Sequence, residues 1–204
     1  AAAFWNMGEN CSCGSRVIVQ ASIEQALLER LKARLSEWKV GLPTDESVKI
    51  GPLVEQAHFE KVKGFLEGAA GEGARLVHGG RIHAEIGSGW YVEPTIFSQV
   101  SAGSQLFREE VFGPVLAVTT FETEEEAIEL ANDSSYGLAA SLYTRDIGRA
   151  QRVARAIQAG TVSVNGFAEG DISTPFGGYK QSGFGGRDKG IEALDQYQQV
   201  KTIW

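Results

Sequence analysis

The chain has 204 residues, 43% of them apolar and 22% charged, which is enough for one large domain or two small ones with a buried core. Its 26 Asp and Glu residues outnumber its 19 Lys and Arg residues, and the net charge of −7 without a basic stripe argues against a nucleic-acid binder. No apolar run approaches the roughly 18 residues of a membrane span, and the first residues lack the charged flank of a signal peptide. We therefore expect a cytoplasmic protein with neither membrane nor nucleic acid as a partner.

Short apolar runs alternate with longer amphipathic ones in the first half of the chain. Ser22 and Gln25 have the spacing of a capping box, so we expect Ser22 to begin a helix that buries Ile23 and Leu27. Residues 81–110 read as loop, apart from a short strand at 91–92. The predicted elements are, in order, a strand at 16–20, this helix, which ends before Gly41, a helix at 58–70 and a strand at 75–77.

The alternation continues more regularly in the second half. Thr123 and Glu126 repeat the capping-box pattern, and Gly160 is expected to end a helix in the left-handed conformation. The predicted elements are a strand at 115–121, a helix through Asn132, a strand at 139–143, a helix at 146–158, a strand at 161–165 and a final strand at 200–204. This order indicates an α/β fold with a largely parallel sheet flanked by helices.

A loop before the first predicted strand carries the two cysteines of the chain, Cys11 and Cys13, which lie too close together for a disulfide framework. A thiol in this Gly- and Asn-flanked loop could serve as a nucleophile, with loop N–H groups as oxyanion donors. The alternative is a buried structural cysteine. The 3 histidines do not form a metal-ligand spacing with the cysteines, so we expect no metal site.

Seven segments in order resemble the signatures of one enzyme family. The segment from Phe4 to Cys11, followed by Gly14-Ser15-Arg16, resembles the nucleophile motif of the NAD(P)-dependent aldehyde dehydrogenase superfamily. The six others are 51–54 (GPLV), 92–96 (VEPTI), 109–115 (EEVFGPV), 136–140 (YGLAA), 164–166 (VNG) and 175–183 (PFGGYKQSG). The resemblance implies that residues 1–204 are the catalytic domain of an enzyme that oxidises an aldehyde to a carboxylic acid.

The resemblance also implies roles for particular residues. Cys11 matches the nucleophile, which in the family forms a hemithioacetal and then a thioester with the aldehyde carbon. Glu110 matches the carboxylate that holds the nicotinamide ribose of NAD or NADP, and an acceptor-only group suits two hydroxyls. Phe112 matches the aromatic beside the nicotinamide, while His58 and Lys61 match positions near the ribose.

Four further residues match the substrate tunnel of the family. Trp5 and Phe176 correspond to its aromatic walls, with ordinary core packing as the alternative. Glu169 and Asp171 lie in a loop that lines the tunnel mouth in relatives, and their charges would favour a cationic aminoaldehyde. A solvated acidic loop is the alternative. Residues 169–183 look most like the γ-glutamyl-γ-aminobutyraldehyde dehydrogenase branch.

The chain departs from the family pattern in its length. Relatives are more than twice as long, and the general-base Glu, the oxyanion Asn and the cofactor-binding domain have no counterpart here. We therefore expect a domain that is inactive in turnover by itself and belongs to a homo-oligomeric enzyme, associated through C-terminal strands. Two alternatives remain open: a non-catalytic oligomerisation module and a weak Cys11-dependent esterase.

Overall fold

The computed structural model describes residues 2–168 and 170–204, and the chain divides into a first compact unit up to Ala127 and a second from Ile128 to Trp204. The first unit is built on a four-stranded sheet with the order β1-β4-β3-β2. Its strands are β1 (Arg16–Gln20), β2 (Arg75–His78), β3 (Thr95–Ser98) and β4 (Val115–Phe121). Strand β4 is parallel to both β1 and β3, whereas β2 is antiparallel to β3. The predicted α/β fold with a largely parallel sheet is therefore confirmed.

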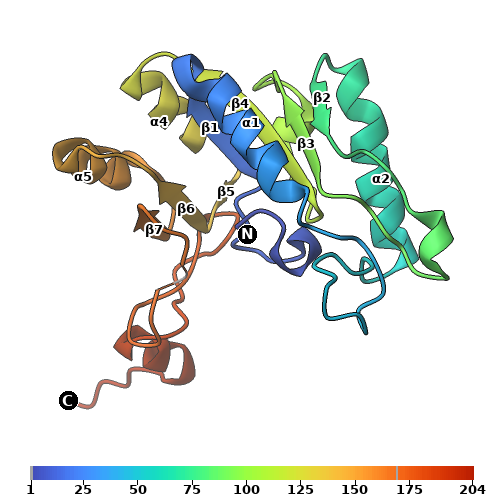
Figure 1. The fold of residues 1–204 in the computed structure, drawn as a ribbon. Helices are drawn as coiled ribbons and strands as arrows, with labels where there is room; N and C mark the ends of the chain where they lie inside the picture. The colour runs from blue at the N-terminus through green and yellow to red at the C-terminus, as the bar shows by residue number, and fades with distance from the viewer. Residues whose placement is uncertain (1, 169) are drawn as a thin grey trace. The chain divides into compact units, whose positions relative to one another are not determined.

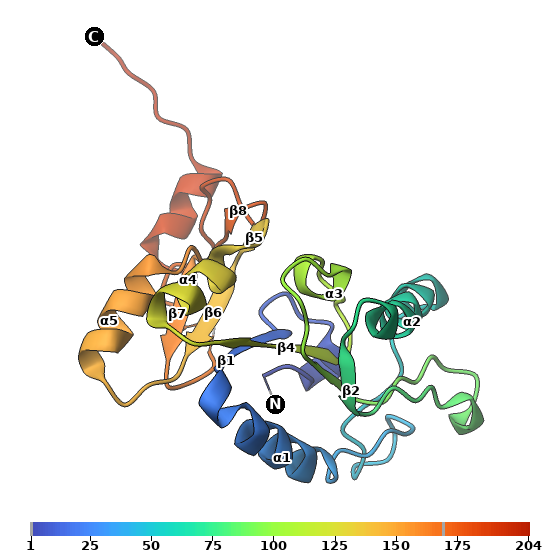
Figure 2. The same ribbon diagram turned by 90° about the horizontal axis from the view of Figure 1, so that it is seen from above.

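Helices cover both faces of this sheet. Figures 1 and 2 show α1 (Glu24–Leu35) on one face, and α2 (Gln56–Gly71) with the short α3 (Gln105–Arg108) on the other. Leu28 and Leu35 of α1 belong to one buried cluster with Ile96, Leu116 and Val118 of the central strands. Neighbouring strand residues point to opposite faces, so Phe97 and Ala117, which are also buried, face the other side. This two-sided burial requires the nearly continuous apolar strands that the sequence has.

Strand β3 lies in the stretch that the sequence analysis predicted to be loop, and that prediction was wrong. All four of its residues are buried. Thr95 is fully buried, and its hydroxyl donates to the Glu93 carbonyl at 2.7 Å and accepts the Gly80 N–H at 2.8 Å. A polar residue such as Thr95 favours a loop when only the sequence is considered. In the fold its hydroxyl is hydrogen-bonded, so Thr95 can be buried in a central strand.

The expected capping box at Ser22 is also wrong. Residues Ala21–Ile23 form a single 3-10 turn, and α1 begins after it with Ile23 as its N-cap and no side-chain cap. Ser22 lies inside that turn, so its hydroxyl is not placed at the helix start. Ile23 is consequently 53% exposed, and the buried face of α1 starts at Leu28.

Helix α4 (Glu124–Asn132) begins as the sequence predicts. The Thr123 hydroxyl accepts the Glu126 N–H at 3.2 Å. The Glu126 carboxylate reaches back to the N–H of Glu122 at 2.8 Å, one residue earlier than in a standard capping box.

The second unit contains two small sheets. Strands β6 (Ala139–Leu142) and β7 (Thr161–Val164) pair in parallel and are connected through α5 (Ile147–Ala156), whereas β5 (Tyr136–Gly137) and β8 (Tyr179–Lys180) pair antiparallel. The chain also forms the 3-10 helices η1 (Trp5–Gly8), η2 (Ala21–Ile23), η3 (Ala84–Ile86) and η4 (Ile191–Tyr197).

Two predictions fail in the second unit. Gly160 does not adopt the expected left-handed conformation. A glycine is nevertheless needed at this position, because a Cβ there would collide with the carbonyl of Gly177. The expected strand at 200–204 is not formed, and the side chains of Val200 and Trp204 are fully exposed. β-forming residues need a neighbouring strand to accept their backbone hydrogen bonds, and none pairs with this tail in the described part of the chain.

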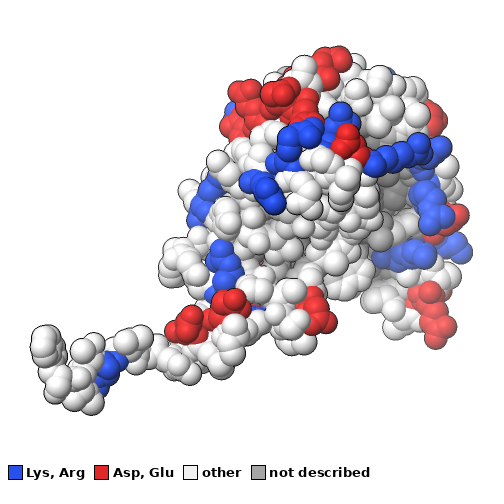
Figure 3. Space-filling view, turned by 90° about the vertical axis from the view of Figure 1, so that its left-hand side faces the viewer, with Lys and Arg blue, Asp and Glu red and all other residues white. Residues whose placement is uncertain are grey.

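Charged side chains of both signs lie on the face of the molecule that Figure 3 shows. On the face shown in Figure 3, Lys and Arg lie in separate groups interspersed with Asp and Glu. None of the described helices combines the length and the apolar character that crossing a bilayer requires.

Candidate active site

The loop that carries the cysteines has an unusual backbone. Asn6, Met7 and Gly8 have φ values of 50°, 57° and 75°, so three consecutive residues are left-handed. Only glycine adopts this region without cost. Gly8 is required for a second reason, because a Cβ there would collide with the carbonyl of Gly113. The loop is therefore held in a strained form against the turn that follows Phe112.

Cys11 is exposed at the end of this loop. The side-chain oxygen of Asn10 organises its surroundings: it accepts the Ser12 N–H and hydroxyl, each at 3.2 Å, and lies 3.6 Å from Cys11 Sγ. Within the described residues, no acceptor binds the backbone N–H of Cys11. The exposure of Cys11 removes the alternative of a buried structural cysteine.

Two other loop residues differ from Cys11. Cys13 is partly buried, and its Sγ lies 3.8 Å from the carbonyl of Trp5, which fits a packing role. The Trp5 side chain is 59% exposed, so it is not a core residue of the first unit.

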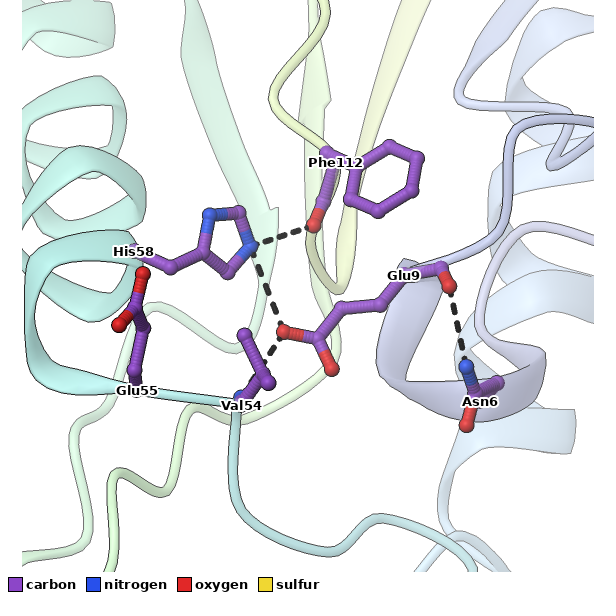
Figure 4. A pocket seen from close by; sticks show the side chains of 6 residues that line it. All are labelled: Asn6, Glu9, Val54, Glu55, His58 and Phe112. Atoms are coloured by element: carbon purple, nitrogen blue, oxygen red, sulfur yellow. Dashed lines mark hydrogen bonds and ion pairs between the residues drawn. The ribbon is translucent and has the colours of Figure 1, made fainter.

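A pocket of about 370 Å³ lies between this loop, the start of α2 and the Phe112 turn. Figure 4 shows the Glu9 carboxylate and the backbone carbonyl of Phe112 both facing the His58 ring, whereas the Phe112 ring points away from it. His58 Nε2 is 2.7 Å from the Phe112 carbonyl and 3.4 Å from a Glu9 carboxylate oxygen. Both neighbours are acceptors, so Nε2 carries the proton.

Glu110 and Lys61 also lie together. Lys61 Nζ donates to the backbone carbonyl of Glu110 at 2.8 Å. Burial raises the pKa of the half-buried Glu110 carboxyl above its ordinary value, and the charge of Lys61 opposes that rise. No hydrogen bond reaches either carboxylate oxygen from the described residues, so both remain available as acceptors.

The remaining predicted residues belong to the second unit. Asp171 is exposed, and its carboxylate accepts the Ser173 N–H at 2.9 Å and hydroxyl at 2.8 Å. These hydrogen bonds, followed by the charge of Lys189, hold the Asp171 pKa below its ordinary value. Phe176 is half-buried in a backbone bridge with Asp188, and Lys189 Nζ lies 5.1 Å from its ring centre. Glu169 lies outside the described residues.

The sequence analysis missed the residues that join these segments. Glu9 accepts the Val54 N–H at 3.0 Å, and the Asn6 side-chain amide donates to the Glu9 carbonyl at 3.0 Å. The sequence places Glu9 within the nucleophile motif, but its burial and its contacts with Val54 and His58 are visible only in the fold. Among the described residues, no group of three His, Cys, Asp or Glu is placed to hold a metal ion.

An exposed cysteine at the end of a strained loop in an α/β fold is an arrangement that suits a thiol nucleophile. Comparison with known proteins identifies the family more closely. The model of the aldehyde dehydrogenase family matches residues 1–203, and the chain belongs to that family.

Two curated relatives are aldehyde dehydrogenases whose names state a substrate. The chain is 56% identical over 202 residues to an aminoacetaldehyde dehydrogenase of Pseudomonas aeruginosa and 48% identical over 201 residues to a betaine aldehyde dehydrogenase of Cereibacter sphaeroides. These matches cover 99% and 98% of this chain but only 40% and 41% of the relatives, so the chain spans about two fifths of their length.

Solved structures agree with the fold. A cysteine-to-alanine variant of the indole-3-acetaldehyde dehydrogenase of P. syringae, in complex with NAD+ and IAA, superposes with a TM-score of 0.95 at 44% identity. That match covers 100% of this chain and 41% of the solved one. The aldehyde dehydrogenase KauB of Pseudomonas aeruginosa gives a TM-score of 0.94, also at 44% identity, over 98% of this chain and 40% of the other.

Proposed function

We propose that this chain is the catalytic domain of an NAD- or NADP-dependent aldehyde dehydrogenase, with Cys11 as the nucleophile. The observation that carries the proposal is the exposed Cys11 on a loop held against the Phe112 turn. The family membership and the NAD+ complex of a solved relative support it.

Cys11 would attack the aldehyde carbon as a thiolate, forming a C–S bond and an oxyanion that is protonated to a hemithioacetal. The N–H of Cys11 has no acceptor in the described residues and is suited to donate to that oxyanion. After oxidation the carbon is a thioester, which water hydrolyses to the carboxylic acid and the free thiol. The resemblance assigns activation of that water to a Glu with no counterpart in this sequence.

The residues predicted to hold the cofactor fit a nicotinamide dinucleotide. The two free acceptor oxygens of Glu110 suit the paired hydroxyls of a ribose, and Lys61 keeps a positive charge beside them. Phe112 supplies an aromatic ring and His58 a neighbouring polar group. The bound dinucleotide would supply the acceptor for the hydride that leaves the substrate.

The test uses a chimera in which this chain replaces the matched segment of the Pseudomonas aeruginosa aminoacetaldehyde dehydrogenase. We expect the chimera to reduce NAD+ or NADP+ in the presence of an aldehyde, and the 204-residue chain alone to give no turnover. In the chimera, the substitution Cys11→Ser should lower kcat by more than about 1,000-fold, since a hydroxyl is a far weaker nucleophile than a thiolate.

The matched control is Cys13→Ser, which keeps a donor near the Trp5 carbonyl and should retain kcat within about twofold. Turnover that survives Cys11→Ser would contradict the proposal. A chimera without turnover would favour the non-catalytic module, and Cys11-dependent hydrolysis of a p-nitrophenyl ester by the chain alone would favour the esterase.

We further propose an aminoaldehyde as the substrate. The 56% identity to an aminoacetaldehyde dehydrogenase supports this choice. Asp171 supports it too, because its lowered pKa keeps the carboxylate charged at neutral pH. An exposed negative charge attracts the ammonium group of such a substrate over about a Debye length of 10 Å.

In the chimera, the pair Glu169→Gln and Asp171→Asn should raise KM for aminoacetaldehyde by about 5-fold, as the loss of two weak charge interactions would. Asn keeps the oxygen that accepts the Ser173 N–H, so the turn is preserved. Steady-state assays should show KM for uncharged propionaldehyde unchanged and the difference shrinking at high salt. An equal rise for both aldehydes would rule out charge recognition.

A further inference from the structure

Glu9 joins three segments that lie far apart in the sequence. One of its carboxylate oxygens accepts the Val54 N–H at 3.0 Å, directly before α2, and lies 3.4 Å from His58 Nε2 in the first turns of α2. The same Nε2 is 2.7 Å from the Phe112 carbonyl. Figure 4 shows these contacts as one continuous chain from the cysteine loop to the Phe112 turn.

This chain of contacts is shielded from water although it borders a pocket. The side chains of Glu9 and His58 are 10% and 13% exposed. Hydrogen bonds to a charged acceptor are stronger in such surroundings than at an exposed position. Removing the carboxylate would leave the Val54 N–H and the His58 Nε2–H without this acceptor. Glu9 is therefore costly to remove.

The Phe112 backbone needs such support. Its φ of 58° is left-handed, which is uncommon and strained for a bulky residue. The hydrogen bond from His58 Nε2 holds the Phe112 carbonyl in that orientation, and the Glu9 carboxylate lies against the same Nε2. Gly8, next to Glu9, packs directly on Gly113.

We propose that Glu9 is a positioning residue: acting through His58, its carboxylate sets the Phe112 turn relative to the Cys11 loop and thereby the affinity for the dinucleotide. This inference rests on the proposed function for its last step only. In this role Glu9 needs no contact with the substrate or the reacting atoms.

Hydrogen exchange of the 204-residue chain tests the geometric step without activity. Glu9→Ala should speed exchange in residues 52–58 and 110–114 by about 10-fold or more, as expected for lost charged hydrogen bonds. Strand β4 should exchange at its original rate. Glu9→Gln keeps an acceptor oxygen and should restore most of the protection, and the control Glu60→Gln, on the exposed side of α2, should change nothing.

A double-mutant cycle tests whether Glu9 acts through His58. In a His58→Ala background, Glu9→Ala should add little further exchange at 110–114, because the connection is already broken. Unchanged exchange at 110–114 in Glu9→Ala would overturn the proposal. An equal increase in β4 would also overturn it, because it would mean a general loss of stability.

Kinetics of the chimera test the functional step. Glu9→Ala should raise KM for the dinucleotide about 10-fold, with KM for the aldehyde changed less than about twofold. A fall in kcat alone, or an equal rise of both KM values, would overturn it. If the unsubstituted chimera oxidises no aldehyde, the proposed function fails, and the exchange data still decide the role of Glu9.

Discussion

Several individual residues at the candidate site of the first unit have a left-handed backbone. Asn6, Met7, Gly8 and Phe112 all have positive φ, and they lie in the two segments that the pocket brings together. Such strain persists only where the surroundings over-determine it. Here the Asn6 amide, the Glu9–His58 contact and the packing of Gly8 on Gly113 supply that support.

Gly8→Ala tests the close approach. A methyl group would combine a φ of 75° with a collision at the Gly113 carbonyl, so we expect a loss of about 2–4 kcal/mol in the free energy of unfolding. The control Gly64→Ala adds a Cβ within α2 that meets nothing within 4 Å and should stabilise by about 0.5–1 kcal/mol. Urea unfolding measures both, and equal effects would contradict the steric argument.

At the scale of elements, short helices of this chain depend on side-chain caps. Helix α3 begins at Ser104, whose side chain accepts the Phe107 N–H. Helix α5 begins at Asp146, whose carboxylate accepts the Arg149 N–H at 2.8 Å. Because helices of this length are marginal in isolation, their caps contribute noticeably to local stability.

Asp146→Ala should lower the free energy of unfolding at pH 7, because α5 loses the side-chain cap at its N-terminus. The Arg149 N–H holds the Asp146 pKa below its ordinary 3.8 in the folded state. The charged carboxylate therefore stabilises the fold above that value, and its contribution disappears as the pH falls through the lower folded pKa.

Denaturation followed by circular dichroism at pH 7 and near pH 3 checks this expectation. The difference between the native chain and Asp146→Ala should shrink at the lower pH. Asp146→Asn keeps an acceptor oxygen and loses the charge, so it should cost less at pH 7 and depend less on pH. A difference that grows on acidification would have the wrong sign.

At the scale of the whole molecule, the sheet of the first unit explains why distant motifs meet. Strand β4 pairs in parallel with β1 and β3, and the segments before β1 and before β4 both contribute to the site. Residues 9 and 112 therefore become neighbours despite their separation in sequence. The chain divides into two compact units, so the expectation that residues 1–204 form one catalytic domain stays a prediction.

Local patterns in the sequence predicted most of the elements. The strands at β1, β2, β4, β6 and β7, the helices α2, α4 and α5, and the cap of α4 follow from apolar periodicity and capping residues. The start of α1 was predicted wrongly. Strand β3 and the unpaired C-terminal tail were also predicted wrongly, because strand formation depends on a neighbouring strand that the local pattern does not contain. For β3 that neighbour is β4 on one side and β2 on the other.

The sequence by itself determined the family, the α/β class and the identity of Cys11, His58, Lys61, Glu110 and Phe112 as candidates, because each lies within a contiguous motif. Only the tertiary structure revealed Glu9 as the link between them. It also showed that the thiol is exposed, that Glu110 is half-buried with a raised pKa, and that Phe112 is left-handed. These properties arise from burial and from contacts between segments that are distant along the chain, so no local sequence pattern contains them.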